Sequence, residues 1–274
     1  MTTITQIGHS RVEFKPSKSI LTRSSGYIGT FDYTLNPYGG CTFGCTYCYA
    51  AFFARTETLK AEWGNWVQVK ENALDLLKKR RRPLNGQTIY MSSVTDPYQP
   101  IEKELELTRA ILEELAAYHQ PRLVIQTRSP LVTRDIDVLT QFQHVQINMT
   151  VTTDDEAVRR VFEPTCPSNA RRLEAVQRLH QAGLRTCITM TPLLPVRDPQ
   201  QFAEAVLATG ADKFVVQHFH ASERRFVAGT GNAALDLFEE RRWTAETYAR
   251  VVMIMRQTLP DLWEGQAGFA PVWD

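Results

Sequence analysis

Cysteine is scarce in this sequence, and long apolar runs are absent. Five cysteines occur among 274 residues, an odd number that does not fit a framework of paired disulfides. No run of 18 apolar residues, long enough to cross a membrane, is present. The start of the chain, MTTITQIGHSRVEF, lacks the apolar segment of a secretory signal peptide. Unpaired thiols therefore predict a protein of the reducing cytoplasm. The absence of a long apolar run predicts that the membrane is not a partner.

An excess of charge of either sign is lacking too. The net charge is +1, with 43% hydrophobic and 22% charged residues, as in an ordinary globular protein with a full core. Short basic runs occur at residues 78–82, 171–172, 224–225 and 241–242, and each is consistent with a solvated helix end or with a phosphate contact. Charge therefore neither requires nor excludes nucleic acid as a partner.

Three of the five cysteines are concentrated in residues 36–50, NPYGGCTFGCTYCYA. Cys41, Cys45 and Cys48 have the spacing C-x3-C-x2-C, and thiolates are the usual ligands of iron–sulfur clusters. Because a cubane cluster has four iron corners, three ligands from one loop leave one iron open to a substrate or cofactor. The glycines of the loop permit the positive φ angles that wrapping a chain around a cluster requires.

A zinc site is the main alternative for these cysteines. Structural zinc takes four ligands and commonly uses two separate C-x2-C pairs. Beyond the loop, only Cys166, Cys187 and six scattered histidines remain as candidate ligands. The ligand count therefore favours an iron–sulfur cluster.

Strand-like and helix-like segments alternate along most of the chain. The strands are expected at residues 31–35, 88–92, 123–126, 145–151, 185–190 and 213–217, with a further extended segment at 66–69. The helices are expected near residues 49–60, 71–82, 101–119, 134–141, 155–162, 169–181, 199–209 and 245–257. This order predicts an α/β fold of right-handed βαβ units, and six units fit a partial, three-quarter (β/α)6 barrel of the TIM type.

The pattern divides the chain into three parts. Residues 1–30 are expected to form an irregular N-terminal arm, residues 31–220 the partial barrel, and residues 221–274 a helical extension that closes it. In parallel α/β folds the chemistry lies at the carboxyl ends of the strands. The cysteine loop follows the first predicted strand, so it is expected at that face.

The cysteine spacing, with an aromatic residue directly before the third cysteine, resembles that of the radical S-adenosylmethionine (SAM) superfamily. Beyond the superfamily motif, the chain looks like the branch that contains spore photoproduct lyase and the DNA-repair-photolyase-like proteins. Four stretches between Asn36 and Pro195 carry this likeness: NPYGGCTFGCTYCYA, SSVTDPYQPIE, QTRSPLVTRDIDVL, and VFEPTCPSNARRLEAVQRLHQAGL with the following TPLLP. The resemblance implies a [4Fe–4S] cluster on Cys41, Cys45 and Cys48, SAM chelated to its open iron, and an electron donor such as flavodoxin or ferredoxin.

The resemblance also assigns four side chains to SAM. Tyr47 matches the aromatic residue beside the adenine, although a lone tyrosine also suits a core position. Arg128 stands where the lyase has a lysine on the SAM carboxylate, which an arginine can bind bidentately; a salt bridge at the barrel rim is the alternative. Thr150 matches a serine on that carboxylate or is structural. Asp96 matches a group that binds the SAM amine, or it caps the loop before the next helix.

One position departs from the lyase pattern. Spore photoproduct lyase carries a hydrogen-donating cysteine after its second strand, and Ser93 stands there in this chain. The O–H bond of serine is too strong to replace a thiol, and neither Cys166 nor Cys187 is an evident substitute. Tyr49, with Tyr47, matches paired tyrosines implicated in the hydrogen relay of the lyase, which makes Tyr49 the candidate catalytic residue. Activity on spore photoproduct is therefore not expected.

Two histidines, His218 and His220, alternate at the end of the last predicted strand. Such a pair can bind a second metal or hold substrate. It can equally be buried and hydrogen-bonded in the core. The sequence leaves both roles open.

Two functions from different classes follow. The first is a radical SAM enzyme that cleaves SAM reductively to a 5′-deoxyadenosyl radical, which abstracts hydrogen from an unidentified substrate. The resemblance implies nucleic acid as that substrate, while a peptide or a small molecule stays open. The alternative is a non-catalytic regulatory protein that binds metal or nucleic acid on the same fold. Because the chain keeps both the cysteines and the candidate SAM residues, the enzyme is favoured.

Overall fold

The computed structural model describes residues 4–219, 232–269 and 273. Its largest sheet has eight strands: β3 (Leu21–Arg23), β4 (Tyr33–Leu35), β7 (Thr88–Met91), β8 (Arg122–Thr127), β9 (Val145–Thr150), β10 (Arg185–Met190), β11 (Lys213–Val216) and β12 (Leu262–Glu264). Their order is β12-β11-β10-β9-β8-β7-β4-β3. All neighbours from β4 to β12 are parallel, and β3 pairs with β4 in the antiparallel sense. The carboxyl ends of seven strands therefore point to the same edge.

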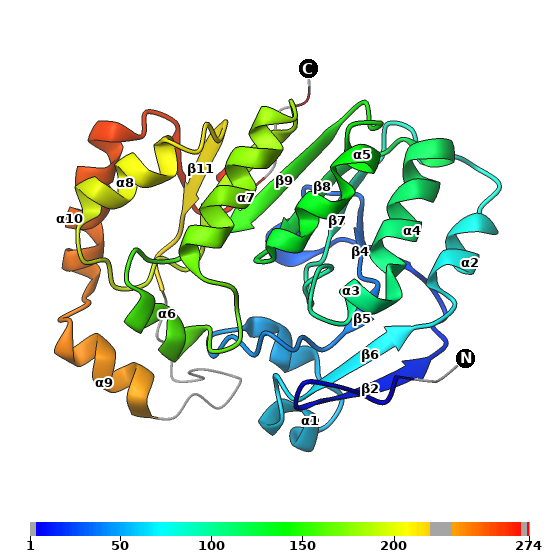
Figure 1. Cartoon of the computed structure of the whole chain (residues 1–274), viewed down its shortest axis with the longest axis horizontal. Helices are drawn as coiled ribbons and strands as arrows, with labels where there is room; N and C mark the ends of the chain where they lie inside the picture. The colour runs from blue at the N-terminus through cyan, green and yellow to red at the C-terminus, as the bar shows by residue number, and fades with distance from the viewer. Residues whose placement is uncertain (1–3, 220–231, 270–272, 274) are drawn as a thin grey trace.

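Helices cover one face of this sheet (Figure 1). They are α2 (Ala73–Lys78), α4 (Leu107–Glu114), α5 (Ile136–Leu139), α7 (Asn169–Gln181), α8 (Pro199–Leu207) and α10 (Ala245–Thr258). Apolar residues of the strands, such as Ile125 and Ile147, form one large core with helix residues such as Leu112 and Val176. β9 is buried along its whole length, as expected of a parallel strand covered on both faces.

The other face is covered by segments from both ends of the chain. Phe31 and Phe269 pack there with strand residues such as Val124 and Val215. Two 3-10 segments, η1 (Gly26–Ile28) and η5 (Gln266–Gly268), lie on this side. The Gln266 amide donates a hydrogen bond of 2.7 Å to the carbonyl oxygen of Tyr27. Segments near the two ends of the described chain thus meet over this face of the sheet.

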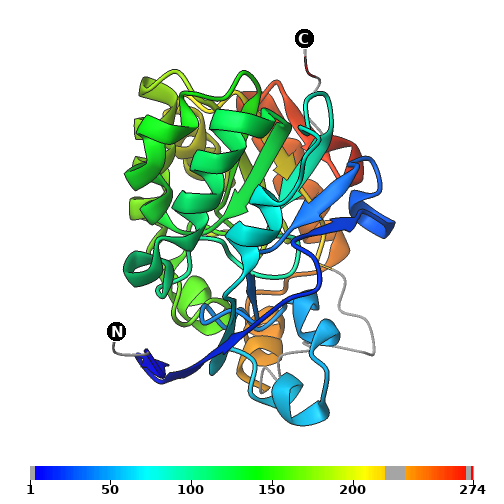
Figure 2. The same ribbon diagram turned by 90° about the vertical axis from the view of Figure 1, so that its right-hand side faces the viewer.

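A second, four-stranded sheet holds the cysteine loop. Its strands are β1 (Gln6–Ile7), β2 (Ser10–Lys15), β5 (Tyr38–Gly39) and β6 (Trp66–Lys70), in the order β1-β2-β6-β5. This sheet lies below the main one, together with η2 (Tyr49–Phe53) and α1 (Glu57–Ala61) (Figure 2). The cysteine loop leaves β5 and the chain returns through β6, which pairs with it. The pairing of β5 with β6 therefore anchors both ends of the segment that contains the cysteine loop.

The six parallel strands expected from the sequence are present, and the expected helix at 169–181 is confirmed in α7. The expectation of an irregular segment before the barrel is wrong in part, because residues 4–30 include β1, β2 and β3. The C-terminal region adds a seventh parallel strand, β12, and a helix that was not expected, α9 (Asn232–Glu240). None of the described helices is long and apolar enough to span a membrane.

The long helix expected at 101–119 is interrupted. It divides into α3 (Glu102–Leu105), α4 and a π-helical turn at Leu115–His119, with Glu106 at a φ of 50° between the first two. The buried Glu102 carboxylate accepts the backbone N–H groups of Thr108 and Arg109. These donors are at the start of α4, where helical N–H groups lack partners. The expected helix at 49–60 likewise divides into η2 and α1.

Candidate active site

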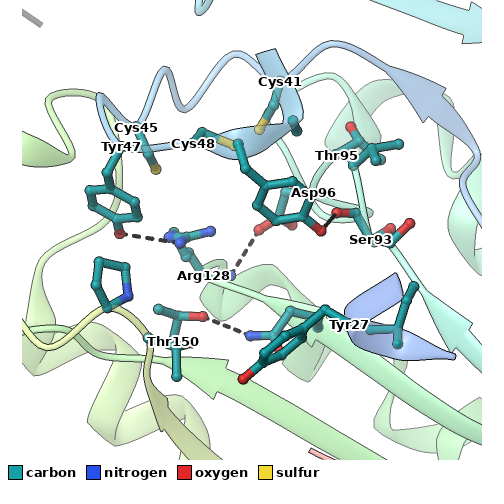
Figure 3. A pocket seen from close by; sticks show the side chains of 18 of the residues that line it. Tyr27, Cys41, Cys45, Tyr47, Cys48, Ser93, Thr95, Asp96, Arg128 and Thr150 are labelled. Atoms are coloured by element: carbon teal, nitrogen blue, oxygen red, sulfur yellow. Dashed lines mark hydrogen bonds between the residues drawn. The ribbon is translucent and has the colours of Figure 1, made fainter. Parts of the chain in front are cut away.

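A cavity of about 530 Å³ opens at the carboxyl ends of the parallel strands. All eight site residues expected from the sequence line it: Cys41, Cys45, Tyr47, Cys48, Tyr49, Asp96, Arg128 and Thr150. They come from the cysteine loop and from the ends of β7, β8 and β9, whose carboxyl ends meet at one edge of the sheet. Figure 3 shows the cysteine sulfur atoms along one wall, with Arg128 between them and Thr150.

The cysteine loop is tightly folded. Gly40 has a φ of +69°, and a Cβ at this position would lie 2.5 Å from the ring of Trp66. A Cβ on Gly44, whose φ is +57°, would lie 3.2 Å from the Cα of Gly64. All three cysteines of the loop line the cavity. Among the described residues, no fourth cysteine lies on its wall. This donor set fits a cubane cluster with one open iron.

Asp96 fastens the loop after β7 to the end of β8. Its Oδ1 accepts the Tyr98 N–H at 2.9 Å and the Thr127 hydroxyl at 2.7 Å, and its Oδ2 accepts the Arg128 N–H at 2.8 Å. Burial raises the pKa of Asp96, and these hydrogen bonds offset part of the rise. Both oxygens are already engaged, which agrees with the capping role considered from the sequence.

Tyr47 and Arg128 belong to one network. The Arg128 guanidinium donates a hydrogen bond of 3.1 Å to the Tyr47 hydroxyl, and its carbon lies 5.6 Å from the centre of the Tyr47 ring. The Tyr47 hydroxyl in turn donates to the carboxylate of Glu163, which also lies 3.6 Å from Arg128 Nε. Burial raises the pKa of Tyr47 well above its ordinary value, while the charge of Arg128 opposes the rise. The salt bridge considered for Arg128 is therefore present, and its partner is Glu163.

Sequence reasoning missed Glu163, which is fully buried between two arginines. Its Oε2 lies 2.5 Å from Nη2 of Arg172, and its Oε1 accepts the Thr152 hydroxyl at 3.0 Å. Burial alone would raise the pKa of Glu163, but the charges of Arg172 and Arg128 outweigh it and lower the value to about 2. Both Glu163 and Arg172 lie in the stretch VFEPTCPSNARR, but a charged residue beside a predicted helix normally faces solvent, so the pattern gave no sign of burial.

Thr150 lies on a polar floor that the sequence did not predict. The Gln126 side chain donates hydrogen bonds to the hydroxyls of Thr150, at 2.7 Å, and Thr189, at 3.0 Å. The Tyr90 hydroxyl donates to Gln126 Oε1 at 2.9 Å. These side chains come from four adjacent strands and point to the same face, because strand residues alternate. The floor is thus a connected set of hydroxyl and amide groups.

Tyr49 contacts Ser93 at the edge of the cavity. The Tyr49 hydroxyl donates a hydrogen bond to the backbone oxygen of Ser93, and both residues line the cavity. Although 54% of the residue is exposed, desolvation around its hydroxyl raises the pKa of Tyr49 to about 12, so this hydroxyl keeps its proton near neutral pH. Cys166 and Cys187 are both buried and neither lines the cavity. Among the described residues, the wall therefore offers no thiol outside the cysteine loop that could replace a donor at position 93.

Only one of the two histidines, His218, lies among the described residues. His218 follows the end of β11, lines the cavity, and packs edge-on against Tyr248 with ring centres 4.6 Å apart. His220 lies outside the described residues. The hypothesis of a paired site is therefore not tested.

The sequence is similar to a known protein family and to several known proteins. The model of the Radical SAM superfamily matches residues 35–208, more than half of the chain. Uncharacterized protein MJ0683 of Methanocaldococcus jannaschii is 38% identical over 163 residues, which are 60% of this chain and 61% of that protein. Uncharacterized protein ORF301 of Acidianus two-tailed virus is 30% identical over 221 residues, 75% of this chain and 72% of the relative. The Radical SAM Nalpha-GlyT isomerase of Pseudomonas phage M6 is 24% identical over 249 residues, which are 85% of this chain and 51% of the isomerase.

Solved structures share the fold. Spore photoproduct lyase complexed with dinucleoside spore photoproduct has a TM-score of 0.60 at 15% identity, with 92% of this chain and 81% of the lyase covered. A variant of that lyase with bound AdoMet and the same dinucleoside has a TM-score of 0.59 at the same identity and coverage. Together with the family match, these findings agree with the expected branch. The chain belongs to the radical SAM superfamily: it is a radical SAM enzyme, and its cofactors are those of the family, a [4Fe–4S] cluster and SAM.

Proposed function

We propose that Cys41, Cys45 and Cys48 hold the cluster and that the adjoining cavity receives SAM and the reacting part of a substrate. When bound, the cluster supplies the electron that cleaves SAM, and the resulting 5′-deoxyadenosyl radical abstracts hydrogen from the substrate. The observation that carries the proposal is that all eight expected residues line the same cavity. An electron donor such as flavodoxin or ferredoxin, and a location in the cytoplasm, are part of it.

The proposal includes the architecture expected from the sequence. The open, mainly parallel sheet is taken as the three-quarter barrel, with residues 1–30 as an arm, 31–220 as the barrel and 221–274 as the closing extension. Support comes from Phe269, which packs with Phe31 and Val215 over the inner face. An open barrel leaves room for a large substrate beside the cysteine loop.

Each residue has a proposed role toward SAM. Arg128 pairs with the carboxylate, since its guanidinium lies on the wall beside the thiols, and the Thr150 hydroxyl adds a hydrogen bond from the floor. The Tyr47 ring packs against the adenine. Asp96 is proposed to hold Arg128 in place through its backbone N–H rather than to bind the amine directly. Tyr49 is the candidate for hydrogen transfer to or from the substrate.

Nucleic acid is the proposed substrate class. Spore photoproduct lyase, which shares the fold, is described with a dinucleoside ligand. At the mouth of the cavity, Tyr27 is 41% and Tyr49 54% exposed, and Phe53, whose ring packs edge-on against Tyr49, is 67% exposed. Exposed aromatic rings stack with unpaired bases. The serine at position 93 separates the proposed reaction from that of the lyase, because no described thiol beyond the cluster loop lines the cavity.

Anaerobic reconstitution with iron and sulfide tests the function. We expect a cubane EPR signal in the reduced protein, a change of that signal on adding SAM, and release of 5′-deoxyadenosine. Cys48→Ala should abolish all three, while Cys187→Ala, which removes a buried thiol outside the cavity, should keep them. A cluster indifferent to SAM, or no cluster at all, would favour the non-catalytic alternative.

A further inference from the structure

A fourth thiol lies directly behind the cysteine loop. The Sγ of Cys166 is 3.6 Å from the Sγ of Cys45 and 4.0 Å from the carbonyl oxygen of Phe43, both within the range of a hydrogen bond that involves sulfur. Cys45 lines the cavity and Cys166 does not, so Cys166 contacts Cys45 from outside the cavity. Both side chains are buried. The contact joins residues 121 positions apart in the sequence.

Hydrogen bonds hold this contact in place from both sides. The Thr46 N–H donates to the Phe162 carbonyl oxygen at 2.9 Å, and the Thr165 hydroxyl donates to the Thr42 carbonyl oxygen at 2.7 Å. These bonds join the cysteine loop to the end of α6 (Glu156–Phe162) and to the turn that follows it. The carbonyl oxygen of Cys166 itself accepts a hydrogen bond of 2.9 Å from Arg159. The position of Cys166 relative to Cys45 is therefore fixed by its surroundings.

We propose that Cys166 is a positioning residue whose S–H group donates a hydrogen bond to the Cys45 thiolate and so raises the reduction potential of the cluster. The inference rests on the proposed function, because Cys45 must be a cluster ligand. Reduction adds one electron and one negative charge to the cluster. A donor aimed at a ligand sulfur stabilises the more negative state, and such hydrogen bonds are among the determinants of cluster potential. Cys166 keeps its hydrogen throughout, so no proton is transferred.

The test compares midpoint potentials of reconstituted enzyme, measured by EPR during reduction with dithionite. Cys166→Ala and Cys166→Val both remove the donor, and the larger Val fills the space that Ala would leave empty, in case the smaller residue disturbs loading of the cluster. At the potential where half of the wild-type cluster is reduced, both variants should show a reduced-to-oxidised ratio about tenfold lower, equal to about 59 mV for one electron. Cys166→Ser retains a donor, and Cys187→Ala removes a buried thiol that lines no part of the cavity; both should titrate close to wild type.

The outcomes separate this inference from the function on which it rests. A cluster that responds to SAM but has the wild-type potential in Cys166→Ala and Cys166→Val would overturn the role of Cys166 alone. A shift of equal size in Cys187→Ala would overturn it too, because the effect would then be general to buried thiols. Wild-type protein that takes up no iron and sulfide would overturn the ligation and, with it, this inference.

Discussion

The carboxylate of Glu163 and the guanidinium of Arg172 form an ion pair closed off from solvent, with Oε2 and Nη2 2.5 Å apart and neither side chain exposed. The same carboxylate accepts the Tyr47 hydroxyl and lies 3.6 Å from Nε of Arg128. A buried pair often contributes no more stability than apolar residues of the same volume. Here the pair also supports two residues on the cavity wall, which links helix α7 to the proposed SAM site.

Removing one partner of this pair should be costly. Arg172→Met leaves the buried carboxylate of Glu163 without its closest cation, so we expect the free energy of unfolding to fall by about 3–5 kcal/mol. Urea denaturation measures the change. The matched control is Arg171→Met, because Arg171 is the exposed neighbour on the same helix. That variant should stay within about 0.5 kcal/mol of wild type; equal losses in both would contradict the importance of the pair.

Glu163 should also affect SAM binding. Glu163→Gln keeps the shape but removes the charge that attracts Arg128, which is expected to loosen Arg128 and Tyr47 together. The concentration of SAM that half-saturates the EPR change should rise about tenfold, which corresponds to 1.4 kcal/mol. Glu156→Gln alters another carboxylate–arginine pair, between the partly exposed Glu156 and the buried Arg159; neither residue lines the cavity, and the variant should leave the SAM response unchanged. Wild-type SAM affinity in Glu163→Gln would show that the carboxylate is only structural.

Gly40 offers a test of the cysteine loop itself. Gly40→Ala should be unfavourable for two reasons. Alanine is strained at a φ of +69°, and its Cβ would lie 2.5 Å from the Trp66 ring. Only the first reason applies to Gly8→Ala, since its φ is +56° and nothing lies within 4 Å. Gly8→Ala should cost about 1–2 kcal/mol and bind iron normally. Gly40→Ala should lose more stability and bind clearly less iron and sulfide, as measured by colorimetric assay. Equal iron content in the two variants would show that the close packing on Trp66 is dispensable.

The parallel strands and the gathering of site residues could be predicted because their signals are local. The parallel strands β4, β7, β8, β9, β10 and β11 are short segments rich in apolar and β-branched residues, and loops after successive parallel strands meet at one edge. This places Asp96, Arg128 and Thr150 beside the cysteine loop, although they are far apart in sequence. The roles of these residues toward SAM remain predictions.

What could not be predicted depends on contacts between distant segments. Strand β2 is short and polar, and it exists as a strand because it pairs with β6, more than fifty residues away. The same holds for the thiol contact of Cys166 with Cys45 and for the burial of Glu163 between arginines. A residue pattern reports local periodicity, whereas these features arise only when the tertiary structure excludes water from paired polar groups.

His119 should make stability depend on pH in the neutral range. Its side chain is fully buried at the end of the π-helical turn, beside the Tyr118 ring, and burial lowers its pKa from the ordinary value of 6.5. The unfolded chain therefore binds the proton more readily than the folded one, and folding is favoured where both are neutral. This contribution is fully present above pH 6.5 and is lost as the pH falls through the folded-state pKa. Urea denaturation between pH 8 and 5.5 should show stability falling with pH in wild type and a smaller decrease in His119→Phe, which has no proton to bind; equal slopes would contradict the prediction.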